Sequence, residues 1–102
     1  MMICRTWIVA GLVLIAPAAH AESMLTSCYR QQAGIAAHKT LPFGTMLRVV
    51  YPETGRGAVV KVGDRGPFGR GRSLDVSCDV ARQLGFFDKG VARLDVTIMG
   101  RK

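Results

Sequence analysis

The sequence predicts a mainly β fold, a small barrel of short strands with one short helix packed on it. Two observations predict the strands: apolar and polar residues alternate on both sides of the turn-forming segment 52–56, and they alternate again from Ala92 to Ile98. A third predicts the helix, because the segment from Ser77 to Gly85 combines a helical spacing of apolar residues with start and stop residues. Without an internal repeat or a low-complexity segment, these elements indicate one small barrel domain.

Six strands and one helix account for most of the chain after residue 21. We expect the strands over 25–29, 34–37, 46–51, 58–62, 73–76 and 92–98. In the last strand, the residues on the core face should be Ala92, Leu94, Val96 and Ile98. Ser77 is expected to cap the helix and Gly85 to end it, and the buried face of the helix should consist of Val80, Ala81 and Leu84.

The first 21 residues have the pattern of a secretory signal peptide. A basic start at Arg5 precedes an apolar run over 7–15. The small residues Ala19 and Ala21 then stand two apart, as at a cleavage site. Because the apolar run is too short to span a bilayer, we expect an exported protein, periplasmic or secreted, with a mature domain over 22–102 and no stable membrane insertion after cleavage.

The segment Leu25-Thr26-Ser27-Cys28 offers a second interpretation of this region, since it resembles the motif whose cysteine becomes lipidated in bacterial lipoproteins. Such a motif normally adjoins the apolar part of the signal, whereas His20 and Glu22 intervene here. Anchoring through Cys28 is therefore the alternative to free export.

In either case, we expect the exported domain to be a monomer.

Two cysteines, Cys28 and Cys78, remain after cleavage of the signal peptide, which contains Cys4. In an exported chain they can form one disulfide, which would close a loop of about fifty residues and stabilise the fold by roughly 3–4 kcal/mol. The other interpretation is that both are unpaired small apolar residues of the core. Only His38 could join them as a metal ligand, and the spacing matches no metal motif, so we predict neither a metal site nor a cofactor.

The chain is strongly basic, with a net charge of +7. Export and the lack of a recognised nucleic-acid module exclude nucleic acid as the expected partner. Arg65, Arg70 and Arg72 cluster around an acidic loop, which predicts an anionic ligand of the cell envelope, such as peptidoglycan with its lactyl and peptide carboxylates. A generally solvated basic surface is the alternative reading of these three residues.

The candidate site lies in the loop Asp64-Arg65-Gly66-Pro67-Phe68 and the following stretch 71–77. A Gly- and Pro-rich loop between strands can hold a reactive side chain against a ligand, because the strands fix its ends. Asp64 is therefore the candidate reactive carboxylate, unless it only accepts hydrogen bonds within the loop or pairs with Arg65. Asp75 is expected to have a structural role, as the partner of a loop arginine or as a turn cap.

Four motifs in order carry a family resemblance: Ala36-Ala37-His38-Lys39-Thr40-Leu41-Pro42-Phe43-Gly44-Thr45, Val62-Gly63-Asp64-Arg65-Gly66-Pro67-Phe68, Gly71-Arg72-Ser73-Leu74-Asp75-Val76-Ser77 and Ala81-Arg82-Gln83-Leu84-Gly85. They resemble the RlpA-like (rare lipoprotein A) family over about 27–98. The resemblance implies a six-stranded double-psi β-barrel. It also implies a lytic transglycosylase that cuts the glycan strands of peptidoglycan and leaves 1,6-anhydro ends.

The resemblance also implies roles for particular residues. Asp64 matches the catalytic aspartate of the family, and His38 matches a histidine near the cleft that could orient the sugar or hydrogen-bond to Asp64. His38 could equally be a packing residue of the barrel. Tyr29 matches the tyrosine that ends the family's first strand and is the expected substrate-binding aromatic. Cys28 stands where the family commonly has an aromatic residue and Arg30 where it has glycine, so part of the sugar-stacking wall is expected to differ.

One departure from the family pattern puts the activity in question. Active members carry a longer loop with a glutamate before the Ala-Ala-His motif, whereas here only Arg30-Gln31-Gln32-Ala33-Gly34 separates Tyr29 from Ile35. A lytic transglycosylase uses no water, so one carboxyl group acting first as acid and then as base can suffice. The alternative function is a non-catalytic barrel that binds peptidoglycan or loosens the wall.

Overall fold

A computed structural model of the chain describes residues 21–69 and 71–101. The predicted signal peptide lies outside these residues except for Ala21, and it stays a prediction. The elements in chain order are β1 (Glu22–Tyr29), β2 (Ile35–His38), β3 (Thr45–Tyr51), β4 (Arg56–Asp64), β5 (Leu74–Ser77), α1 (Cys78–Leu84) and β6 (Val91–Arg101).

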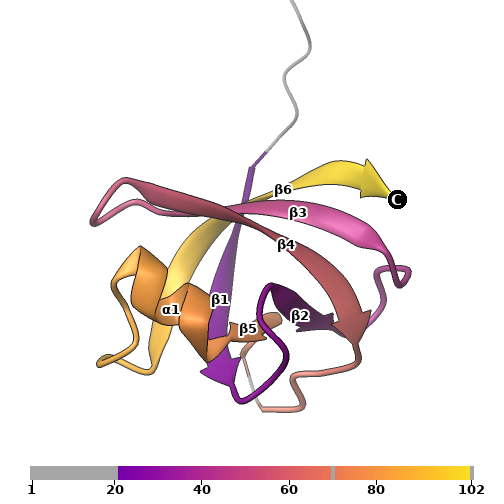
Figure 1. Cartoon of the computed structure of the whole chain (residues 1–102), viewed down its shortest axis with the longest axis horizontal. Coiled ribbons are helices and arrows are strands. Elements are labelled where there is room, and N and C mark those ends of the chain that lie inside the picture. Colours follow the sequence, from indigo (N-terminus) through magenta and orange to yellow (C-terminus); the bar gives the residue numbers. More distant parts are fainter. Residues whose placement is uncertain (1–20, 70, 102) are drawn as a thin grey trace, which may run out of the picture.

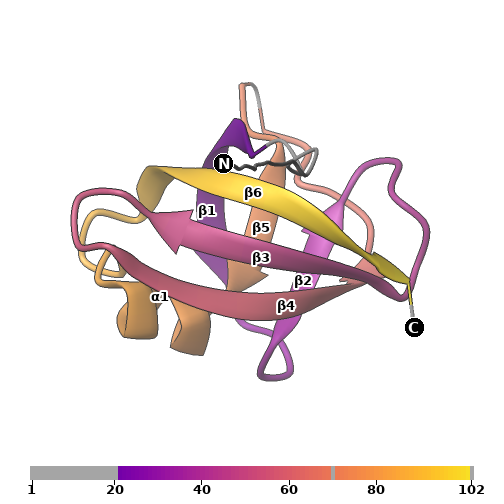
Figure 2. The ribbon, with the colours of Figure 1, turned by 90° about the horizontal axis from the view of Figure 1, so that it is seen from above.

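The six strands close into one barrel in the order β1, β5, β2, β4, β3, β6 (Figure 1). Neighbouring strands are antiparallel except for two parallel pairs, β1 with β5 and β2 with β4. Strands β3, β4 and β6 run side by side as one long layer, and β1, β2 and β5 cross behind it (Figure 2). The predicted six-stranded barrel with one short helix is confirmed.

The core is built by alternate residues of the long strands. In the hairpin of β3 and β4, Leu47 lies opposite Val60 and Val49 opposite Ala58, as the alternation predicts. Leu47 and Val49 are completely buried. From the other layer, the core receives the buried side chains of Met24, Ala36, Leu74 and Val76.

Strand β6 differs from the prediction near its end. The predicted core face is buried as far as Val96, but Ile98 is 53% exposed. The pairing of β6 with β3 explains this, because Leu47 pairs with Ile98 and Met46 with Gly100, which leaves Met99 as an extra residue. Such a bulge bends the strand and breaks the alternation, so Ile98 does not reach the core.

Helix α1 packs against β1, β4 and β5 at one end of the barrel (Figure 1). Gly85 ends it in the left-handed conformation, with φ of 103°, and its N–H donates to the carbonyl of Ala81 at 2.9 Å. Ser77 stands at the N-cap position as predicted, but its side chain makes no capping bond. Its Oγ instead accepts the N–H of Gly34 at 3.1 Å, so this hydroxyl fixes the loop after β1.

Among the described residues, no helix is long and apolar enough to cross a membrane.

Phe86 anchors the segment that leaves α1. Its side chain is completely buried, and its ring meets that of Tyr51 edge to face, with centroids 5.8 Å apart. Tyr51 ends β3, so this contact joins the helical end of the chain to the long layer of the barrel.

Replacing Phe86 with alanine should lower the free energy of unfolding by about 3–5 kcal/mol, because it leaves a cavity in the core and removes the contact with Tyr51. Urea denaturation followed by circular dichroism measures this change. Phe68→Ala is the matched control, since Phe68 is 86% exposed and its loss should change stability by less than about 0.5 kcal/mol. Equal losses in the two variants would contradict the packing described for Phe86.

Candidate active site

Asp64 is the last residue of β4 and follows a bulge in that strand. Ala36 pairs with Val62 and Ala37 with Asp64, so Gly63 has no partner across the ladder. A Cβ atom at Gly63 would approach the side chain of Ile35 to 3.3 Å, which favours glycine here. Since a bulge re-aims the side chains next to it, the bulge at Gly63 sets the direction of the Asp64 carboxylate at the rim of the barrel.

Three donors surround the half-buried carboxylate of Asp64. Oδ1 accepts the backbone N–H of Arg65 at 2.9 Å, and Oδ2 accepts a hydrogen bond from Nε2 of Gln31 at 3.0 Å. The hydroxyl of Tyr29 lies 3.5 Å from Oδ2 and 3.3 Å from Nε2 of Gln31. Burial is the largest cause that raises the pKa of Tyr29, so its hydroxyl stays protonated and able to donate.

Gln31 is a candidate site residue that the sequence analysis missed, since its side chain contacts Asp64. Its Oε1 accepts the backbone N–H of Gln32 at 2.8 Å, which leaves Nε2 as the end of the amide that faces Asp64. In the sequence, the loop after Tyr29 stands out only as a segment without a carboxylate. A signal was present, however, because a polar amide two residues beyond an aromatic at the end of a strand can reach the same rim as that aromatic.

His38 hydrogen-bonds within its own loop. Nδ1 accepts the N–H groups of Thr40 and Leu41, at 3.1 and 3.0 Å. Burial, as the largest cause, lowers the pKa of His38, so the ring is neutral near pH 7 and Nε2 carries the proton. Among the described residues, no hydrogen bond joins His38 to Asp64, and no group of three or more His, Cys, Asp or Glu side chains could hold a metal ion.

The three loop arginines have separate surroundings. Arg65 donates from Nη1 to the carbonyls of Leu41 and His38, at 2.6 and 3.2 Å, and its guanidinium stacks 4.2 Å above the ring of Phe43. Arg65 therefore holds the loop after β2 against Asp64. The guanidinium of Arg72 covers Gly69, where a side chain would collide with it. Arg70 lies outside the described residues.

Asp75 accepts a hydrogen bond from Oγ of Ser27, its neighbour across the parallel pair of β1 and β5. The sequence analysis expected a loop arginine or a turn as its partner. The register explains the contact with Ser27 instead, because pairing Ser27 with Asp75 brings the hydroxyl to the carboxylate. Arg70 lies outside the described residues, so an arginine partner stays a prediction. Among the described residues, no arginine lies within salt-bridge distance of Asp75.

Cys28 and Cys78 lie together beneath the loop that carries Gln31. Their sulfur atoms are 2.6 Å apart, and both side chains are partly exposed. Burial, followed by the hydrogen bond with Cys78, raises the pKa of Cys28 to about 12, so Cys28 is protonated at neutral pH in the dithiol form. The proximity supports the predicted disulfide, which stays a prediction.

A closed barrel of six strands with two parallel pairs is the fold of a double-psi β-barrel. The family model described as "Lytic transglycolase" matches residues 21–96, and the chain belongs to this family of RlpA-like double-psi barrels.

Its curated relatives carry related names. The probable endolytic peptidoglycan transglycosylase RlpA of Nostoc sp. is 47% identical over 73 residues, which cover 72% of this chain and 20% of that protein. The relative of the same name from Aquifex aeolicus is 44% identical over 71 residues, covering 70% and 31%. The chain therefore spans only about a fifth to a third of the length of these relatives.

Solved structures show the same fold at low identity. An expansin of Clavibacter michiganensis, crystallised as a mutant in complex with cellohexaose, superposes with a TM-score of 0.64 at 18% identity. The match covers 78% of this chain and 50% of the expansin. At this identity the likeness concerns the barrel alone.

Thiol labelling tests the pairing of Cys28 and Cys78. Protein exported to an oxidising compartment, then denatured without reductant, should react with no maleimide, and reduction should lower the free energy of unfolding by roughly 3–4 kcal/mol. Cys28→Ser with Cys78→Ser is the control and should lose the response to reductant. Labelling of both cysteines without reductant would refute the pairing.

Proposed function

We propose that this chain is an exported peptidoglycan lytic transglycosylase that cuts glycan strands and leaves 1,6-anhydro ends. The observation that carries the proposal is the Asp64 carboxylate, aimed by the bulge at Gly63 and hydrogen-bonded by Gln31, in a chain of the lytic transglycolase family. The printed names of the relatives supply the substrate class, and the activity is proposed because the chain covers only part of their length.

One carboxyl group can perform both proton transfers of this reaction. Protonated Asp64 gives its proton to the glycosidic oxygen as the bond from that oxygen to C1 breaks. The sugar's own 6-hydroxyl then attacks C1, and its proton passes to the Asp64 carboxylate as the anhydro ring closes. At the end of the reaction Asp64 is protonated again, and no water has been consumed.

The neighbours of Asp64 would assist through position. Gln31 and Tyr29 hold Oδ2, which leaves the carboxylate little freedom to rotate away from the sugar. His38 has a protonated Nε2 that is able to donate to a sugar hydroxyl, since its Nδ1 is occupied by its own loop. Tyr29 is only partly buried, so its ring is available to pack against a sugar.

The short loop after β1 supports a second candidate, a non-catalytic barrel that binds peptidoglycan or loosens the wall. Among the described residues, no second carboxylate shares a hydrogen bond with Asp64 or with its partner Gln31. The comparisons do not favour this candidate. Product analysis separates the two functions, because only an enzyme releases anhydro-ended fragments.

Asp64→Asn tests the catalytic role. The variant keeps the size of the side chain but removes its exchangeable carboxyl proton, so anhydro products from peptide-free glycan strands should fall by about 10²–10⁴-fold. Mass spectrometry of the released fragments measures the rate. Asp88→Asn, at an exposed turn residue, should leave the rate unchanged. Wild-type protein that binds glycan yet releases no anhydro ends, beside an active relative, would refute the enzyme and leave the binding barrel.

Gln31→Ala tests the positioning role. Loss of the bond to Oδ2 of Asp64 should lower kcat by about 10- to 100-fold and change KM by less, because the carboxylate is no longer held against the sugar. Gln32→Ala is the matched control, since its side chain is exposed and only its backbone N–H contacts Gln31. A fall in kcat of the same size in both variants would show that the loop, rather than the amide of Gln31, sets the rate.

A further inference from the structure

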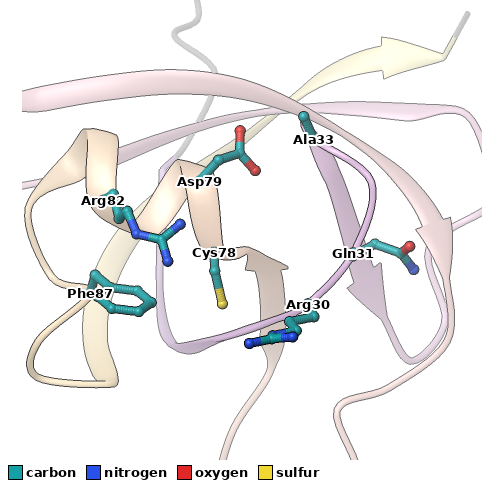
Figure 3. Close-up of a pocket in the computed structure, with 7 residues that line it drawn as sticks. All are labelled: Arg30, Gln31, Ala33, Cys78, Asp79, Arg82 and Phe87. Atoms are coloured by element: carbon teal, nitrogen blue, oxygen red, sulfur yellow. The ribbon is translucent and has the colours of Figure 1, made fainter.

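A hollow of about 480 Å³ opens on the side of the loop after β1 and is distinct from the rim that carries His38 and Asp64. One wall is that loop, with Arg30, Gln31 and Ala33, and the other is α1 and the segment after it. The second wall contributes Cys78, Asp79, Arg82 and Phe87 (Figure 3). Neither the fold nor the proposed proton transfers explain the side chains gathered here.

The charges of the hollow are unbalanced. Arg30 reaches in from the loop and Arg82 from the helix, with the sulfur of Cys78 between them (Figure 3). Among the described residues, neither guanidinium lies within 4.0 Å of a carboxylate oxygen. Asp79 also lines the hollow, so two positive charges face one negative charge and the hollow carries a net charge of about +1.

Arg82 is held in place before any ligand arrives. Its guanidinium lies 4.1 Å above the centroid of the Phe87 ring, which restricts the side chain and leaves its in-plane N–H groups available. A planar guanidinium of this kind binds a carboxylate through two parallel hydrogen bonds. Because the side chain is already ordered, binding costs less conformational entropy than it would for a mobile arginine.

Phe87 gives the hollow an apolar side. Phe87 is 38% exposed and is not part of the buried core, unlike its neighbour Phe86. With Ala33 on the opposite wall, it offers a surface for a short aliphatic group attached to the anion. A net charge of about +1 suits a singly charged group, and Asp79 opposes a doubly charged phosphate.

We propose that this hollow is a subsite for a carboxylate carried on a short aliphatic chain of peptidoglycan. That chemistry occurs in the lactyl ether of muramic acid and in the stem peptides. The proposal rests on the proposed function for its substrate class. It is joined to the reaction by Gln31, which lines the hollow and also donates to Asp64, so an occupied subsite places the polymer beside the reactive carboxylate.

Binding measured by NMR tests the subsite without reference to activity. Isotope-labelled wild-type protein is titrated with a peptide-free oligosaccharide of alternating N-acetylglucosamine and N-acetylmuramic acid. A chitooligosaccharide of equal length, which lacks the lactyl carboxylate, serves as the matched ligand. The muramic-acid ligand should bind at least about 10-fold more tightly and shift the amides of Ala33, Asp79 and Phe87, and the difference should shrink with added salt.

Variants assign the difference to the two arginines. Arg30→Gln with Arg82→Gln should weaken the muramic-acid ligand by about 10-fold or more and leave the chitooligosaccharide unchanged. Arg48→Gln with Arg93→Gln removes the same charge from exposed strand positions and should change neither ligand by more than about 2-fold. Equal weakening in both double variants would overturn the subsite. Equal affinity of the wild type for both ligands, together with no shift of the amides of the subsite by a soluble stem peptide, would also overturn it.

Two competition experiments identify the chemical nature and the source of the carboxylate. A soluble stem peptide that competes at the same amides assigns the subsite to the peptide, and a peptide without effect assigns it to the lactyl group. Inorganic phosphate that displaces the muramic-acid ligand at equimolar concentration would overturn the preference for a single charge. Carboxylate binding without anhydro products would refute the proposed enzyme alone, and anhydro products with no arginine dependence of binding would refute the subsite alone.

Discussion

Closure of the barrel is the constraint on which the rest of the structure depends. Strands β1 and β4 are not neighbours, and two strands, β5 and β2, lie between them in the barrel. The end of β1 nevertheless meets the end of β4, because the loop after Tyr29 spans the rim and carries Gln31 to Asp64. Within each parallel pair, β1 with β5 and β2 with β4, the strands run the same way, but β5 and β2 are antiparallel, so β1 and β4 run in opposite directions around the barrel. The loop after Tyr29, and not the direction of the strands, therefore brings Gln31 to the carboxylate of Asp64.

The fold was largely predictable because it follows from short-range patterns. The alternation in β3 and β4, and the stop at Gly85, depend on residues close in sequence, and each element formed near its predicted bounds. The errors arose where pairing between distant strands decides the outcome. Ile98 is exposed because of a bulge opposite β3, and the hydroxyl of Ser77 contacts Gly34 instead of the helix. Neither event leaves a trace in the local alternation of apolar and polar residues.

The site was predictable only in part, for the same reason. Asp64 could be singled out by its place after an apolar strand in a Gly- and Pro-rich loop, and Cys28 and Cys78 by elimination. The partners of Asp64 could not, because Gln31 lies thirty-three positions away and reaches it only through the closed barrel. Arg65 was assigned to the ligand from its charge alone. The structure gives its guanidinium two backbone carbonyls and the ring of Phe43, contacts that no charge pattern encodes.

The cysteine pair lies where the rim and the hollow meet. Cys28 precedes Tyr29 at the end of β1, and Cys78 begins α1 and lines the hollow. A bond between them would fix the start of the loop that carries Arg30 and Gln31 against the helix that carries Arg82. Both walls of the hollow and the donor to Asp64 would then share one covalent support at the start of the loop. The end of the loop is held by hydrogen bonds, from the N–H of Gly34 to Ser77 and from the N–H of Lys61 to the carbonyl of Gly34. A short loop of five residues needs such support, because a hydrogen bond from an exposed glutamine holds a carboxylate in position only as well as the backbone beneath it is held.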